Sequence, residues 1–175
     1  MTMTQEDTRT QILDITQLAA QYCAALENAR EAEKKDFIVE MLDYLPRLYW
    51  QFSNLEVTTL EENDFSYLPS YVDEDYYENI RRNVETLMGA DDIFLETFEE
   101  DMKYSDTPVS ASISESLADI FQSLFNFVSV IRDSEGENAV EAYCECHENF
   151  ECYWSQTLCN VMRALNRLRY HGTEE

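Results

Sequence analysis

ISESLADIFQSLFNFVSVI, at residues 113–131, is the most apolar helical pattern in this chain of 175 residues. Its apolar residues recur at every third or fourth position, which places them on one face of a helix. The face is formed by Ile113, Leu117, Ile120, Leu124, Phe127, Val128 and Ile131, and it is widened by Phe121 and Phe125. Ser112 and Glu115 have the spacing of a capping box and predict the start of this helix. So wide an apolar face predicts the central helix of a bundle.

Helical spacing extends over most of the remaining chain. It predicts helices at residues 12–26, 36–52 and 76–88, and a long final helix from about 137 to 171. The chain contains only 3 glycines and 3 prolines, and this scarcity favours long helices with few turns. One of them, Pro46, lies inside the second helix and predicts a kink there. The sequence therefore predicts an all-α fold, a single domain of residues 1–175 built as a bundle of five to six helices, with essentially no strand.

Two regions lack the helical period. Residues 56–75 form a predicted long loop, which carries Phe65, Tyr67, Leu68 and Tyr71 and is therefore expected to be pinned to the core. Residues 1–9 are polar and predict a flexible N-terminus, without the basic and apolar regions of a signal peptide. Residues 120–131 are the longest apolar stretch and are too short to span a bilayer. We expect a cytoplasmic protein whose 5 cysteines are reduced thiols.

The charge is strongly negative. Twelve Lys and Arg stand against 36 Asp and Glu, which gives a formal net charge of −24. A field of this sign repels nucleic-acid backbones and anionic lipid heads, so neither nucleic acid nor a membrane is an expected partner. A nucleic-acid mimic is an alternative that rests on acidity alone. The expected partners are a basic protein surface or another copy of the same chain.

Five segments identify a family resemblance. They are YENIRR at 77–82, FEEDMKYSD at 98–106, ISESLADIF at 113–121, CHENFECYW at 146–154 and RAL at 163–165. In their order and content they resemble a bacterial family known as domain of unknown function 5063. Its members are acidic helical proteins of about this length, found mainly in gut anaerobes. The resemblance covers nearly the whole chain and implies a single bacterial cytoplasmic domain, but it implies no activity, cofactor or catalytic residue.

The final helix carries a group of metal-ligand residue types, namely Cys144, Cys146, His147, Glu148, Glu151 and Cys152. Their spacing differs from that of a zinc finger, in which pairs of cysteines lie in loops. A di-iron site needs a Glu-x-x-His motif on each of two helices, and neither of the 2 histidines has a glutamate three residues before it. A catalytic thiol is not expected either, because nearby glutamates would raise the pKa of Cys144. No metal and no cofactor are therefore expected.

His147 and Glu151 form the candidate pocket or buried polar pair. They are four residues apart and share a helical face with Phe150, Trp154 and Leu158. The simplest interpretation is a buried imidazole hydrogen-bonded to a carboxylate. The alternative is that both side chains line a pocket between helices.

Two charged groups are candidate interaction surfaces. The acidic one consists of Asp91, Asp92, Glu99, Glu100 and Asp101, and the basic one of Arg163, Arg167 and Arg169. Solvated faces, and cations that complement a helix C-terminus, explain such groups without any function. The sequence favours a non-enzymatic acidic protein-interaction module that could self-associate. The alternative is a ligand-binding protein or enzyme with an inter-helix pocket near His147 and Glu151.

Overall fold

A computed structural model describes residues 3–57, 68–96, 103–104 and 109–172. The helices are α1 (Gln5–Glu27), α2 (Lys34–Asn54), α3 (Glu74–Met88), α4 (Ile113–Asp133), α5 (Ala139–Asn149) and α6 (Ser155–His171). The short elements are η1 (Ala29–Glu31), η2 (Gly89–Asp92), η4 (Phe150–Trp154), β1 (Ile93–Leu95) and β2 (Ser110–Ser112). The predicted all-α class is confirmed, and α5, η4 and α6 follow one another as the predicted final helix, interrupted by a π-helical turn at η4.

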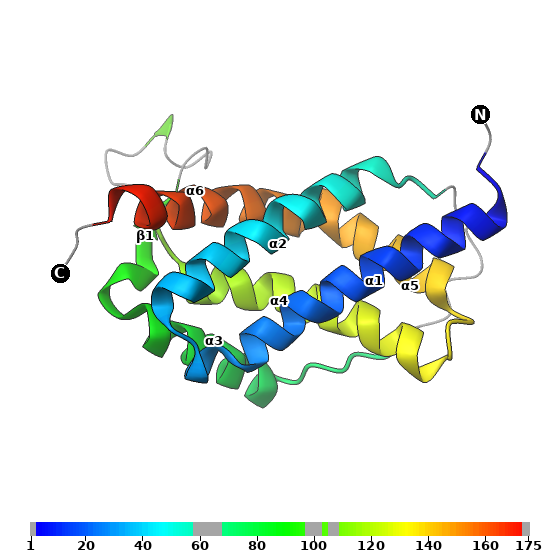
Figure 1. Cartoon of the computed structure of the whole chain (residues 1–175), viewed down its shortest axis with the longest axis horizontal. Coiled ribbons are helices and arrows are strands. Elements are labelled where there is room, and N and C mark those ends of the chain that lie inside the picture. Colours follow the sequence, from blue (N-terminus) through cyan, green and yellow to red (C-terminus); the bar gives the residue numbers. More distant parts are fainter. Residues whose placement is uncertain (1–2, 58–67, 97–102, 105–108, 173–175) are drawn as a thin grey trace.

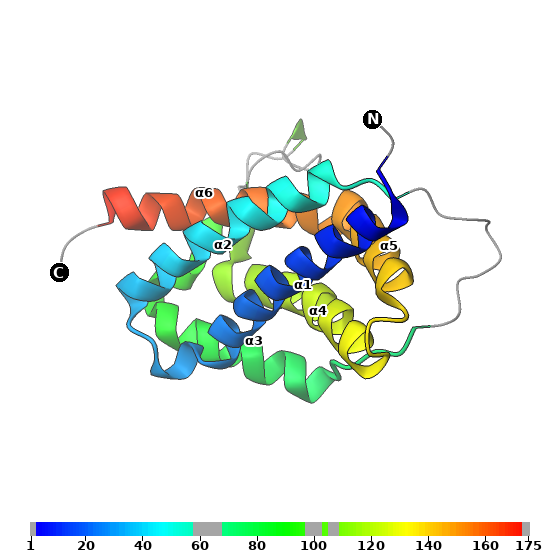
Figure 2. The ribbon, with the colours of Figure 1, turned by 45° about the vertical axis from the view of Figure 1, so that its right-hand side comes forward.

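Helix α4 lies at the centre of the bundle, as its apolar face predicts. It packs against α1, α3, α5 and α6, while α2 packs against α1 and α6 (Figure 1). Its first turn is capped by Ser112, whose hydroxyl accepts a hydrogen bond from the N–H of Glu115 at 3.1 Å. The predicted capping position is therefore correct. Helices α5 and α6 extend in different directions from the π-helical turn, so that they run toward opposite ends of the molecule (Figure 2).

The N-terminal helix begins earlier than predicted. Residues 5–9, expected to be flexible, form the first turns of α1. Thr4 and Asp7 make a capping box, in which each side chain accepts a hydrogen bond from the other residue's backbone N–H. The capping box explains the difference, because it satisfies backbone donors that a polar segment would otherwise leave to water. Helix α2 contains Pro46, as the predicted second helix does, and this residue is exposed.

A short β-hairpin was not predicted. In it β1 pairs antiparallel with β2, with Ile93 opposite Ser112 and Leu95 opposite Ser110. It follows Gly89, which ends α3 with a positive φ of 58°. The two strands have three residues each. The hairpin brings η2 against the start of α4, a position that matters for Asp92 below.

The predicted loop 56–75 is described at residues 56–57 and 68–73, and these parts, between α2 and α3, are held against the bundle. Leu55 and Val72 are buried, while Leu68 and Tyr71 are partly buried against the core. The backbone N–H of Tyr71 donates to the Oδ1 atom of Asn126 on α4, at 2.7 Å. Phe65 and Tyr67 lie outside the described residues. The expectation of a loop pinned to the core is therefore met where the loop is described.

Candidate functional site

The π-helical turn η4 sets the geometry of the candidate site. Cys146, Phe150, Trp154 and Leu158 are all buried, and they follow one another at intervals of four residues. In a regular α-helix, each four-residue step rotates a side chain by about 40° relative to the previous one. A π-helical turn holds more residues and cancels part of this drift. The wider turn therefore keeps all four side chains in the core.

His147 and Glu151 do meet, but not in the core. The Nδ1 atom of His147 lies 3.2 Å from the Oε1 atom of Glu151. The imidazole is 16% exposed and stacks on Tyr143, with ring centroids 5.5 Å apart, whereas the Glu151 side chain is 61% exposed. Burial of Glu151 was predicted from a regular helical period and is wrong, because the π-helical turn rotates this residue outward. Such an exposed pair contributes little to stability.

An inter-helix cleft of about 240 Å³ exists on another side of α5. It lies between α4 and α5 and is bounded by residues 68–70 and the π-helical turn. Its lining is formed by Leu68, Pro69, Ser70, Gln122, Ser123, Asn126, Phe127, Val130, Ala142, Glu145, Cys146, Asn149 and Tyr153. Neither His147 nor Glu151 belongs to this lining. The predicted pocket near that pair is thus replaced by a cleft on the face of α5 that carries Glu145 and Asn149.

The chemistry of the cleft is polar and unreactive. Burial raises the pKa of the Cys146 thiol well above its ordinary value, and its Sγ atom lies 3.8 Å from the carbonyl oxygen of Ser123. Partial burial, with the neighbouring Glu148 charge, raises the pKa of Glu145. A neutral buried thiol is a poor nucleophile. Among the residues that the structure describes, no group of three His, Cys, Asp or Glu could hold a metal ion.

A model for Domain of unknown function (DUF5063) matches residues 6–171 of this chain. The chain belongs to the DUF5063 family. Among solved structures, the crystal structure of protein BF1032 from Bacteroides fragilis is similar, with 29% sequence identity and a TM-score of 0.78. The similarity covers 94% of this chain and 96% of that chain. No curated protein matches the sequence significantly.

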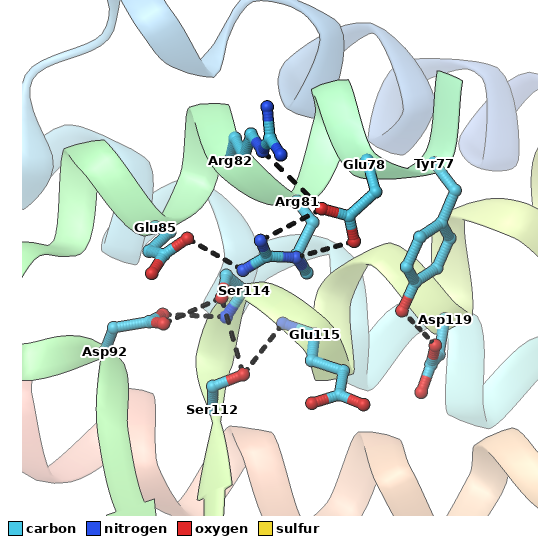
Figure 3. A network of polar contacts seen from close by, with 10 residues as sticks. All are labelled: Tyr77, Glu78, Arg81, Arg82, Glu85, Asp92, Ser112, Ser114, Glu115 and Asp119. Carbon is cyan, nitrogen blue, oxygen red and sulfur yellow. Dashed lines mark hydrogen bonds and ion pairs between the residues drawn. The ribbon is translucent and has the colours of Figure 1, made fainter. Parts of the chain in front are cut away.

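Of the predicted acidic surface of this DUF5063 chain, Asp91 and Asp92 lie within the described residues, and they differ in exposure. Asp92 is 4% exposed, and its carboxylate accepts hydrogen bonds from the backbone N–H and the hydroxyl of Ser114, at 2.8 and 2.7 Å (Figure 3). Asp91 is exposed and pairs with Lys34. The remaining members, at 99–101, lie outside the described residues. Asp92 must therefore be removed from the candidate surface, because the hairpin buries it at the start of α4.

Further polar contacts are made by residues of α3 and α4 in this DUF5063 chain. Arg81 pairs with Glu78 at 3.0 Å and with Glu85 at 2.7 Å, and Tyr77 donates to Asp119 at 2.6 Å (Figure 3). Burial, followed by the hydrogen bond to Asp119, raises the pKa of Tyr77. The i,i+3 and i,i+4 spacing of Arg81 and its partners was readable from the sequence. The bond from Tyr77 to Asp119 was not, because it joins two helices.

The three arginines of the candidate basic patch, Arg163, Arg167 and Arg169, are exposed on α6. Arg163 donates a hydrogen bond to the backbone carbonyl of Leu95, which links β1 to α6. Arg169 lies over the ring of Tyr170, 5.0 Å from its centroid. The patch is thus continuous with the hairpin, a neighbour that the sequence does not show.

The cysteines of this DUF5063 chain are free thiols that differ in access. Cys152 and Cys159 are exposed, whereas Cys23 and Cys146 are buried. Burial raises the pKa of both buried thiols. A thiol-reactive maleimide at neutral pH should therefore label Cys152 and Cys159 first, with Cys23 and Cys146 at least about 100-fold slower because they need local unfolding. Peptide mass analysis over time measures these rates, and equal rates at Cys146 and Cys152 would contradict the assignment.

Proposed function

We propose that the protein is a non-enzymatic interaction module of the cytoplasm that pairs with a second copy of itself in antiparallel orientation. The observation that carries this proposal is the division of charge along the last part of the chain. Residues 133–151 contain no Lys or Arg and seven acids, which are Asp133, Glu135, Glu137, Glu141, Glu145, Glu148 and Glu151. Residues 152–172 contain no acid and carry the basic patch.

The two charged regions reach opposite ends of the molecule. The turn between α4 and α5, which carries Glu135 and Glu137, lies at one end, and the C-terminal end of α6 lies at the other (Figures 1 and 2). Two copies that lie side by side in opposite directions would place each basic end on the partner's acidic end. Such a pair has two-fold symmetry and closes at the dimer. Opposite charges in contact also fix the orientation of the two partners.

Exposed apolar side chains accompany the basic patch. Ile93 and Leu95 on β1 are 64% and 56% exposed, and Tyr170 on α6 is 61% exposed. Arg163 joins the strand to the helix through its bond to Leu95. Apolar side chains rimmed by charge are typical of protein interfaces. The β1–α6 surface therefore offers both the apolar contact and the cations that an acidic partner surface would need.

A charge-exchange experiment tests the pairing. Variant one carries Arg167→Glu and Arg169→Glu, and variant two carries Glu135→Lys and Glu137→Lys. The unmodified chain should be a dimer, and each variant alone should weaken its dimerisation by at least about 100-fold, because like charges would face each other. An equimolar mixture of the two variants should restore a mixed dimer, because one of its two contacts keeps the native charges and the other has both charges exchanged, so that both are complementary. Analytical ultracentrifugation measures all three states.

The control is Arg47→Glu, since Arg47 is an exposed cation on α2 that pairs with Asp43 and lies outside both charged regions. It should leave the dimerisation constant unchanged. A monomeric unmodified chain at 100 µM would refute self-association. So would a dimer that neither charge-exchange variant weakens. Capture of a basic protein by the acidic end, with the chain itself monomeric, would favour the other expected partner instead.

A further inference from the structure

The cleft between α4 and α5 has a lining that selects a particular ligand chemistry. Three carboxamides line it, from Gln122, Asn126 and Asn149, together with the hydroxyls of Ser70 and Ser123. Among the lining residues that the structure describes, Glu145 is the one charged side chain. At about 240 Å³, the cleft lies just below the size range of sites for drug-sized ligands. A ligand of one small ring is the size that it can hold.

We propose that this cleft binds a neutral polyhydroxylated molecule of monosaccharide size. Each hydroxyl both donates and accepts a hydrogen bond, and a carboxamide offers the same combination. Three carboxamides and two serine hydroxyls therefore match a ring with several hydroxyl groups. The ring of Tyr153, which is 71% exposed at the edge of the cleft, provides a flat apolar face for the C–H groups of such a ring.

Other small ligands fit this lining less well. An anion would meet the Glu145 carboxylate and no Lys, Arg or His among the described lining residues. An ammonium ion could pair with Glu145, but it has no acceptor for the N–H groups of the carboxamides. An apolar ligand would displace water from these polar groups without replacing its hydrogen bonds, which weakens binding. Only a ligand with both donors and acceptors satisfies the whole lining.

The cleft is held in place before any ligand arrives. The backbone N–H of Tyr71 donates to the Oδ1 atom of Asn126, which fixes residues 68–70 beside α4. The side-chain amide nitrogen of Asn126 can then donate to a ligand. On the other side, Asn149 and Tyr153 lie at either side of the start of the π-helical turn. Such turns are frequent at functional sites. The preformed walls reduce the ordering cost of binding.

The test is a titration followed by ¹H–¹⁵N correlation spectra. The probes are D-glucose, D-galactose and myo-inositol, with ethanolamine as a cation and glucose 6-phosphate as an anion. At least one neutral probe should cause saturable shifts confined to residues 68–71, 122–130 and 142–153, with a Kd of about 1 mM. Asn149→Ala and Tyr153→Ala should each weaken this binding at least about tenfold, because one removes a donor and acceptor and the other the apolar face.

Gln156→Ala is the matched control, since Gln156 is an exposed carboxamide on α6 outside the lining. Its spectra should titrate as those of the unmodified chain. Tyr153 is exposed, so its substitution should leave the fold intact, and the spectra report this directly. Absence of saturable shifts with all three neutral probes would overturn the proposal. It would also be overturned if ethanolamine or the phosphate produced the shifts, or if Asn149→Ala and Tyr153→Ala bound as tightly as the control.

Discussion

Replacing Asp92 with alanine should lower the free energy of unfolding by about 3 kcal/mol. The side chain is 4% exposed, and its two oxygens accept the backbone N–H and the hydroxyl of Ser114, which is itself fully buried (Figure 3). The substitution leaves both donors unpaired away from water, at a cost of about 1–3 kcal/mol. It also removes a negative charge from the N-terminus of α4, which contributes about 0.3–1 kcal/mol more. Urea unfolding followed by circular dichroism at pH 7 measures the loss.

Asp91→Ala provides the matched control for this result. Asp91 is the neighbouring residue, but its side chain is 46% exposed and it pairs with Lys34 on the surface. Exposed ion pairs contribute up to about 1 kcal/mol, so the free energy of unfolding of this variant should be close to that of the unmodified chain. The free energy of unfolding of Asp92→Asn should lie between those of Asp91→Ala and Asp92→Ala, because asparagine keeps the shape of the side chain and one acceptor oxygen. Equal midpoints for Asp91→Ala and Asp92→Ala would contradict the structural role of Asp92.

The same two residues show why the sequence did not reveal this site. Asp91 and Asp92 are adjacent, identical and acidic, so a local pattern places both in solvent. Their difference arises from the hairpin, which turns the chain so that Asp92 meets Ser114, 22 residues further along. The local start of α4 was predictable from Ser112 and Glu115, because a capping box lies within four residues. Asp92 reaches the start of α4 from another part of the chain, so the residues around the start of that helix give no sign of this contact.

Helix positions were predictable because an amphipathic helix repeats its apolar side chains over many turns. The β-hairpin has only three residues in each strand, which is too short for an alternating pattern to show. The cleft was not predictable at the residue level either. Its lining combines residues 68–70 with residues of α4 and α5, and the hydrogen bond from Tyr71 to Asn126 that holds residues 68–70 beside α4 joins positions 55 residues apart.

The error at Glu151 has a different origin, since its signal was present in the sequence. Four large or apolar residues follow one another at intervals of four, from Cys146 to Leu158. A regular α-helix spreads such a series over about 120° of its surface, because each four-residue step turns the side chain by about 40°. Within the series, a π-helical turn is the local solution, and it changes which residues face outward. Extending a regular period through this segment therefore placed Glu151 on the wrong side.

Trp154, at the end of that π-helical turn, gives the largest effect that we expect. It is 2% exposed, and its ring centroid lies 4.6 Å from that of Phe150 and 4.9 Å from that of Phe52 on α2. Its indole N–H also donates to the carbonyl oxygen of Cys146, at 3.3 Å. Trp154→Ala should therefore lower the free energy of unfolding by about 4 kcal/mol, because removing a buried aromatic side chain leaves a large cavity. Urea unfolding followed by circular dichroism measures this change.

The other tryptophan makes the comparison specific to packing at the π-helical turn. Trp50 lies on α2 and is 66% exposed, so Trp50→Ala removes the same atoms from the surface and should cost less than about 1 kcal/mol. If Trp154→Ala fails to fold, Trp154→Phe keeps an aromatic ring and loses only part of the contact and the indole N–H. That variant should cost about 1–3 kcal/mol, still more than Trp50→Ala. A Trp154 variant as stable as Trp50→Ala would mean that the π-helical turn does not hold this ring in the core.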